Sequence, residues 1–190
     1  MNKTLQNKLK AYSALTVVAV AGASDANAQA EYTAVNYTGG YETYDIDIDG
    51  DGTVDFSVFH GDITNCYTSF STINVINFNF AGNNKMVASS SYYAVALSSG
   101  VTIDAAASLG AGDPTEWCSS YMTSAPGLFG AGYLNGSSWF GSMQGASGFF
   151  LGVEFDISGA SHYGWIRMDV NADISEFTVV DMSYNKTPGD

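Results

Sequence analysis

Short segments with the alternation of β-strands recur along this chain, and no segment after residue 30 has the i, i+3, i+4, i+7 spacing of an amphipathic helix. The composition SGASH between two of these segments is typical of a hairpin turn. Short strands separated by turn residues favour two packed sheets, so we predict an all-β fold, a jelly-roll-like β-sandwich. The expected strands are 53–59, 73–80, 86–98, 149–157, 163–170 and 177–184.

The segment between Gly110 and Gly148 differs from the rest, because Gly, Ser and Ala dominate it and large aromatic residues are scattered through it. We expect long loops there, anchored by aromatic side chains, with one short helix as an additional element. No internal repeat or shift in composition marks a second domain. Residues 31–190 are therefore expected to form a single all-β domain.

Residues 1–30 have the features of a secretory signal peptide. Three lysines make the start basic, a mostly apolar run covers 11–23, and small residues offer cleavage points near Ala28 or Ala30. The apolar run is shorter than the about 20 residues that a membrane-spanning helix needs. We therefore expect a secreted protein, extracellular or at the cell surface, with no transmembrane segment in its mature chain.

The chain is strongly acidic, with six basic and 19 acidic residues and a formal net charge of −13. Loss of the signal peptide would leave only Lys85, Arg167 and Lys186 as basic residues. Phosphate backbones and anionic lipids repel such a chain. Nucleic acid is therefore not an expected partner, whereas divalent cations are.

Cys66 and Cys118 are the two cysteines of the sequence. Export to an oxidising compartment favours a disulfide between them. The bridge would close a loop of about 50 residues and stabilise the fold by about 4 kcal/mol. Two unpaired buried thiols are the alternative, and no motif of a thiol nucleophile surrounds either residue.

Five aspartates crowd the segment DIDIDGDGTVDF at residues 45–56, and four of them match the spacing D-x-D-x-D-G-x-x-D. Such a loop can supply several of the about 6–8 hard oxygen ligands that Ca²⁺ prefers, and Gly52 permits its tight turn. Because so many carboxylates repel one another without a counter-ion, calcium is the expected cofactor. The predicted metal ligands are Asp47, Asp49, Asp51, the carbonyl of Thr53, and Asp55.

Two features separate this segment from an EF-hand. Position 12 of the loop, where an EF-hand has a bidentate Glu, is Val58, and a strand rather than a helix is expected to follow. We therefore predict a strand–loop–strand calcium site with a structural role. Magnesium or manganese at the same ligands, and a solvated acidic turn without metal, are the alternatives.

Several motifs of this chain resemble those of a broad group of secreted bacterial proteins, many of which carry a surface-sorting signal of the PEP-CTERM kind. The motifs are the acidic segment at 47–56, the strand GFFLGVEF at 148–155, the HYGW segment at 162–170 and the end of the chain at 182–189. The role of this group is largely undefined, so the resemblance implies secretion and a β-fold but no activity. Because no apolar anchor precedes Asp190, covalent attachment to the cell surface is not expected.

The HYGW segment is expected to be a strand. On a strand, Tyr163, Trp165 and Arg167 share one face, and His162 and Gly164 share the other. We expect Trp165 to pack in the core, and the whole segment to be a packing signature of a hairpin. A ligand-binding role of His162 or Arg167 is the alternative.

Two functions other than catalysis fit these features. An enzyme is not expected, because His60 and His162 lack a zinc-binding spacing and no nucleophile elbow or phosphate loop occurs. The favoured function is a secreted calcium-binding extracellular structural or matrix protein, with self-assembly at the cell surface as one form of that role. The alternative is a carbohydrate-binding module that holds extracellular polysaccharide on exposed aromatic residues, namely Trp117, Tyr133 and Trp139.

Overall fold

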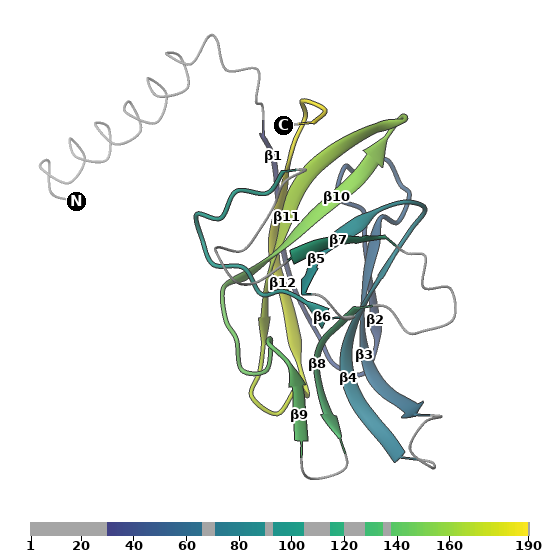
Figure 1. The fold of residues 1–190 in the computed structure, drawn as a ribbon, viewed down its shortest axis with the longest axis vertical. Coiled ribbons are helices and arrows are strands. Elements are labelled where there is room, and N and C mark those ends of the chain that lie inside the picture. Colours follow the sequence, from purple (N-terminus) through teal and green to yellow (C-terminus); the bar gives the residue numbers. More distant parts are fainter. Residues whose placement is uncertain are drawn as a thin grey trace, which may run out of the picture.

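The computed structural model describes residues 30–65, 71–89, 93–104, 115–119, 128–134 and 138–189. In these ranges the chain forms strands and no helix (Figure 1), and hence no helix that could cross a membrane. The strands are β1 (Ala30–Gly39), β2 (Thr43–Ile46), β3 (Phe56–Asn65), β4 (Ser71–Phe80), β5 (Lys85–Ser89), β6 (Tyr93–Ala94), β7 (Thr115–Ser119), β8 (Leu128–Leu134), β9 (Ser138–Gly141), β10 (Phe149–Ile157), β11 (Ala160–Val170) and β12 (Phe177–Asn185).

Hydrogen bonds connect these strands in the order β1-β12-β11-β10-β5-β6-β8-β4-β3-β2, with β7 attached to β5 and β9 to β8. Neighbouring strands in this order are antiparallel except for β6 and β8, which pair in parallel. The hydrogen-bonded sheet bends back on itself, so that the layer of β1, β12, β11 and β10 faces the layer of β2, β3, β4 and β8 (Figure 1). The predicted all-β sandwich is therefore confirmed.

The core lies between these two layers. Phe56 of β3 meets Phe155 of β10 across it, with ring centroids 6.4 Å apart. Tyr37 of β1 stacks on Tyr44 of β2 with ring centroids 3.9 Å apart, so the two end strands of the order contact each other through these side chains. Burying one large apolar side chain contributes about 1.5–3 kcal/mol, so the period-2 pattern decides which face of a strand points inward. In β10 the fully buried inward residues are Leu151, Val153 and Phe155.

The hairpin of β10 and β11 is the one that the sequence predicts. Ile157 pairs with Ala160, which leaves Ser158 and Gly159 as the two turn residues. Both have a positive φ, 55° and 88°, as two-residue hairpin turns of the primed types require. The Asp156 carboxylate accepts a hydrogen bond from the Gly159 N–H at 2.8 Å and further stabilises the turn.

The interpretation of residues 110–148 as long loops needs correction, because β7, β8 and β9 lie in this segment. β7 pairs with β5, and β8 lies between β4 and β9. The small residues of β8 (LFGAGYL) show no alternation, so their own pattern does not indicate a strand. Hydrogen bonds from neighbouring strands hold them extended, an effect of tertiary context that local propensity does not contain. The short helix expected there is not found in the described parts of this segment.

Trp165 does not lie in the core, so that expectation is wrong. In β11 the side chains of His162 and Ile166 are buried, whereas Trp165 lies on the outer face of the layer and is partly exposed. Gly164 allows β12 to come close, since a Cβ at this position would lie 2.6 Å from the Ser183 carbonyl oxygen. The HYGW segment therefore packs against β12 through its glycine, and its tryptophan faces outward.

Two predictions involve residues outside the described ranges. Residues 1–29, which make up most of the predicted signal peptide, lie outside, and β1 begins at Ala30. Cys66 also lies outside, while Cys118 lies on β7 opposite Met86 of β5. Secretion and the disulfide between Cys66 and Cys118 therefore stay predictions.

Replacing Gly164 by Ala is expected to destabilise the protein by about 1–3 kcal/mol, because the added methyl group would force β11 and β12 apart. Urea denaturation would measure this loss. Gly40→Ala is the matched control, since the atom nearest to its added Cβ is the Ser175 carbonyl oxygen at 3.7 Å. The control should change the free energy of unfolding by less than about 0.5 kcal/mol. Equal effects of the two substitutions would contradict the close approach at Gly164.

Candidate metal centre

The acidic segment forms the loop of the β2–β3 hairpin. Ile46 lies opposite Phe56 at the strand pair next to the loop, and the Asp55 N–H donates to the Ile46 carbonyl at 2.9 Å. Ile48, within the loop, is only 2% exposed and belongs to the core cluster. The loop is thus flanked by strands, as predicted, and is anchored to the sandwich by an apolar side chain of its own.

The Asp47 carboxylate lies at the centre of the hydrogen bonds of this loop. Its Oδ1 accepts from the N–H groups of Gly50 at 2.7 Å and Asp51 at 3.1 Å, and its Oδ2 accepts from Gly52 at 2.8 Å. The backbone can coil around the carboxylate because Gly50 and Gly52 have φ angles of 76° and 90°, which L side chains rarely adopt. The tight turn expected at Gly52 therefore depends on Gly50 as well.

Three of the predicted ligands converge on one point. One carboxylate oxygen from each of Asp47, Asp49 and Asp55 lies within 4.8 Å of the other two. Asp51 is not part of this group among the described acidic residues, and its Oδ1 accepts a hydrogen bond from the Thr53 N–H at 2.6 Å. The fold therefore brings the first, third and ninth loop positions together, while Asp51 and Thr53 lie on the exposed rim.

Asp55 is the most buried acid of the loop, at 8% exposure. Its Oδ2 accepts from the Ile48 N–H at 3.0 Å, and its Oδ1 accepts from the Asn84 side chain at 3.2 Å. Desolvation raises the pKa of Asp55 from 3.8 to about 6, the Ile48 hydrogen bond opposes this rise, and the charge of Asp49 adds to it. Desolvation also raises the pKa of Asp49. A cation near these groups would favour their ionised forms.

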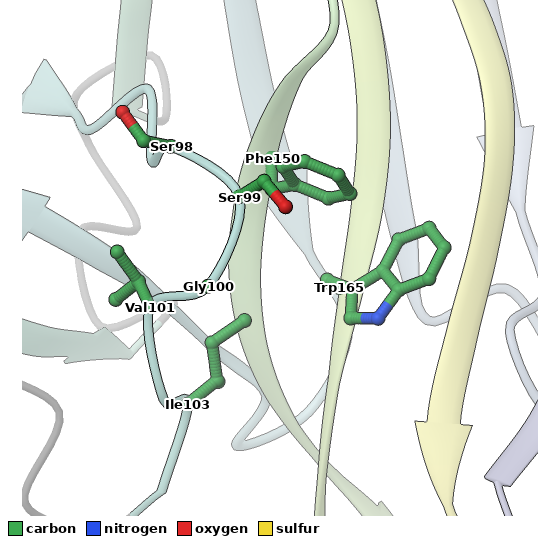
Figure 2. A pocket seen from close by; sticks show the side chains of 7 residues that line it. All are labelled: Ser98, Ser99, Gly100, Val101, Ile103, Phe150 and Trp165. Carbon is green, nitrogen blue, oxygen red and sulfur yellow. The ribbon is translucent and has the colours of Figure 1, made fainter.

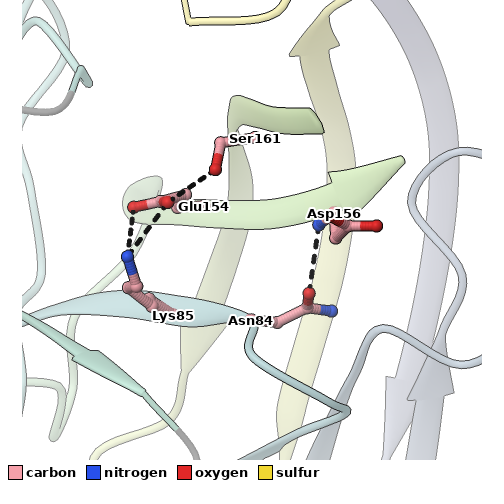
Figure 3. A network of polar contacts seen from close by, with 5 residues as sticks. All are labelled: Asn84, Lys85, Glu154, Asp156 and Ser161. Carbon is pink, nitrogen blue, oxygen red and sulfur yellow. Dashed lines mark hydrogen bonds and ion pairs between the residues drawn. The ribbon is translucent and has the colours of Figure 1, made fainter. Parts of the chain in front are cut away.

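Asn84 is a residue of this site that sequence reasoning missed. Its Nδ2 donates to both the main-chain carbonyl and the carboxylate of Asp55, each at 3.2 Å. Its Oδ1 accepts from the Asp156 N–H of β10 at 3.2 Å (Figure 3). The Asn84 amide thus links the acidic loop to the opposite layer. No local pattern could indicate this role, because Asn83 and Asn84 have the composition of an ordinary turn.

An ion pair beside Asn84 joins β5 to β10. Lys85 Nζ lies 3.0 and 3.1 Å from the two carboxylate oxygens of Glu154, and the Ser161 hydroxyl donates to Glu154 Oε1 at 3.0 Å (Figure 3). Glu154 is only 8% exposed. Because its carboxylate is surrounded by these donors, its role in the described structure is to hold β5 and β11 against β10.

His162 and Arg167, the two residues of the HYGW segment with an alternative ligand-binding role, lie on opposite faces of β11. His162 is buried, with its Nδ1 2.8 Å from the Asn185 carbonyl oxygen. Arg167 lies on the outer face and forms a bidentate ion pair with Asp181, in which Nε lies 2.8 Å from Oδ1. The Tyr32 hydroxyl donates to the same carboxylate at 2.9 Å. The Arg167 side chain remains 38% exposed, so of these two residues it is the one that a ligand can reach.

The residues predicted to form a glycan platform lie on three strands. Tyr133 of β8 pairs with Trp139 of β9, which makes them direct neighbours in the sheet. Trp117 lies on β7, opposite Val87 of β5. The side chains of Trp117, Tyr133 and Trp139 lie outside the described part of the structure, so their role as a platform stays a prediction.

Comparisons of this chain with models of protein families, with curated proteins and with solved structures found no match. The function proposed for the protein therefore depends on its own residues and their geometry.

The pKa of Asp55 predicts a pH dependence of the metal-free protein. Between its ordinary pKa of 3.8 and its folded pKa of about 6, the folded state binds more protons at Asp55 than the unfolded state. Stability should therefore fall as the pH rises through this window. The measurement is the melting temperature from pH 4 to 7 in chelator, for wild type and for Asp55→Asn.

The wild type should lose stability relative to Asp55→Asn across this range, because the asparagine cannot ionise. Asp45→Asn is the control, since Asp45 lies on β2 opposite Ser57 and outside the loop. It should keep the wild-type profile. Parallel profiles of wild type and Asp55→Asn would contradict the raised pKa.

Proposed function

We propose that this protein is a secreted calcium-binding structural protein of the extracellular matrix or cell surface, in which Ca²⁺ held by the β2–β3 loop stabilises the sandwich. The observation that carries this proposal is the convergence of oxygens from Asp47, Asp49 and Asp55 to within 4.8 Å. The signal-like residues 1–30 support the extracellular assignment.

Repulsion within the loop favours a bound cation. Two unit charges 4.8 Å apart repel by about 1 kcal/mol in water and by about 3.5 kcal/mol at an effective dielectric constant of 20. Three such pairs exist in the cluster when all three carboxylates are ionised. A divalent cation would replace this repulsion by attraction, and Ca²⁺ accepts the irregular all-oxygen coordination that a loop of carboxylates and carbonyls offers.

Other buried acids of the described chain have cationic partners, whereas Asp55 has neutral ones. Glu154 pairs with Lys85, and Asp181 pairs with Arg167. Lys186 is the third and remaining Lys or Arg residue after residue 30, and it pairs with Glu31. No basic side chain of the described ranges is thus left to compensate the acidic loop. The missing positive charge is the strongest electrostatic reason to assign a metal ion to it.

The position of the loop favours a structural role of the ion. Asp55 directly precedes Phe56, which packs against Phe155 of the opposite layer. Through Asn84, Asp55 is also linked to the backbone of Asp156 in β10. A cation that holds the Asp55 carboxylate would therefore stabilise the contact between the two layers as well as the β2–β3 turn.

The edge strand β1 favours assembly as part of the structural role. It lies at one end of the strand order, covers ten residues, and has mostly exposed side chains. An unpaired strand edge can add a strand from another molecule. The net charge of −13 opposes contact between copies, and bound Ca²⁺ would reduce this repulsion.

Calcium is expected to raise the melting temperature of the wild type by about 5–10 °C when its concentration is about 100-fold above the dissociation constant. Asp49→Asn should abolish most of this rise, because it keeps the side-chain shape but removes one charge from the cluster. Asp45→Asn is the matched control, because it removes an equal charge from β2 outside the loop, and it should retain the wild-type shift.

Calorimetric titration of the same proteins with CaCl₂ and MgCl₂ would measure binding directly, with the stronger heat expected for calcium. Equal thermal shifts of Asp49→Asn and Asp45→Asn would contradict the assignment of the loop. The absence of binding heat for the wild type at millimolar calcium would contradict calcium binding altogether.

Size-exclusion chromatography tests the assembly. The wild type should elute as larger species in calcium and as a smaller species in chelator, because the ion lowers the repulsion between copies. Asp49→Asn should elute as the smaller species in both buffers. A monomer in both conditions, together with an intact thermal shift, would remove assembly from the proposal and leave the structural role of calcium in place.

A further inference from the structure

A strip of aromatic side chains crosses the outer face of the layer of β1, β12, β11 and β10. Trp165 of β11 lies at its centre, and its ring centroid is 6.5 Å from that of Tyr32 of β1 and 5.2 Å from that of Phe150 of β10. None of the three belongs to the core cluster, and Tyr32 is 59% exposed. Aromatic rings in such positions offer a large, rigid apolar contact surface to a ligand.

Two hollows of about 270 and 230 Å³ flank Trp165. Val101 and Ile103 belong to the wall of both hollows, and Figure 2 shows the first of them. The first hollow extends toward Phe150 of β10, and the second extends toward Tyr184 of β12. Each is smaller than the about 300–1,000 Å³ of a pocket for one compact ligand. The two adjacent hollows therefore suit consecutive rings of a polymer better than one compact ligand.

Residues 97–103 form the wall opposite Trp165, and hydrogen bonds attach this segment firmly to the sheet. Leu97 exchanges two backbone hydrogen bonds with Phe150, at 2.8 and 3.0 Å. Gly152 lets the wall approach β10, because a Cβ at this position would lie 3.1 Å from Leu97 and 3.3 Å from Ile103. The groove between this wall and Trp165 is therefore preformed, which lowers the entropic cost of binding.

Polar groups lie beside the aromatic strip on the same face. Arg167 is two residues from Trp165 along β11, and its guanidinium and the Asp181 carboxylate neutralise each other. Ser98 and Ser99 line the hollow on the Phe150 side (Figure 2). These groups combine hydrogen-bond donors and acceptors, and the Arg167–Asp181 pair carries no net charge of its own, so they suit a ligand that is rich in hydroxyl groups.

We infer that this groove binds a neutral polysaccharide, whose sugar rings place their C–H faces on Trp165 and Tyr32 and their hydroxyl groups toward the Arg167–Asp181 pair. Sugars combine an apolar ring face with a polar rim, which matches this arrangement of side chains. An anionic polysaccharide is disfavoured by the net charge of −13. Self-assembly in the proposed function uses the hydrogen-bonding edge of β1 rather than this face of the layer. The inference goes beyond the calcium loop, with which the groove shares no residue.

Affinity electrophoresis of the purified protein tests this inference, with gels that contain soluble β-glucan, xylan or galactomannan and with alginate as the anionic comparison. Co-sedimentation with insoluble cellulose and chitin extends the test to crystalline polymers. At least one neutral polymer should retard or retain the wild type, and alginate should not. Trp165→Ala should weaken the binding about tenfold or more, and Tyr32→Ala should weaken it measurably.

Tyr41→Ala is the matched control, because Tyr41 is 61% exposed and lies between β1 and β2, away from the groove. It should bind as the wild type does. The calcium-induced thermal shift, measured on each variant, reports folding and separates a failure of the groove from a failure of the calcium loop. The inference is overturned if no neutral polymer binds, if alginate binds more tightly, or if folded Trp165→Ala binds as well as Tyr41→Ala.

Discussion

The contact between β3 and β10 is the constraint on which the rest of this protein depends. Phe56 and Phe155 meet across the core at 6.4 Å and bring two layers together from distant parts of the chain. Because side chains alternate along a strand, a residue that points into the core places the residues next to it on the outer face. The residue before Phe56 is Asp55 of the acidic loop, and the outer face of β10 carries Phe150 of the groove. Both candidate sites are thus positioned by the same apolar packing.

Basic residues are scarce in this chain, so most acidic side chains have no basic partner. Within the described ranges, Lys85 and Arg167 each compensate one buried acid, Glu154 and Asp181, and thereby fasten neighbouring strands. The loop of β2 and β3 has no such partner among the described residues, and desolvation raises the pKa of its buried Asp55 carboxyl to about 6. Without a basic partner, the acids of such a loop stay protonated at low pH, and once ionised they repel one another unless a cation from solution binds them.

Much of the fold could be predicted from the sequence, because strands buried on one face follow a period of two. The β10–β11 hairpin and its turn were predicted within a few residues. The strand expected at 53–59 is β3, which begins at Phe56 and continues to Asn65. β1, β7, β8 and β9 were not among the expected strands. In β8 (LFGAGYL) the small residues show no alternation of their own. Trp165 was expected in the core, yet the alternation of β11 that turns His162 and Ile166 inward places Trp165 on the outer face.

The sequence by itself determined the all-β class and the spacing of the aspartates in the loop, because both depend on residues that are neighbours along the chain. Only the tertiary structure decided that Asp47, Asp49 and Asp55 converge while Asp51 stays on the rim, and that Asn84 joins them to β10. It also decided that Tyr32, Phe150 and Trp165 form one strip. These contacts join residues far apart in the chain, and their distances are set by how the layers pack, which no local pattern contains.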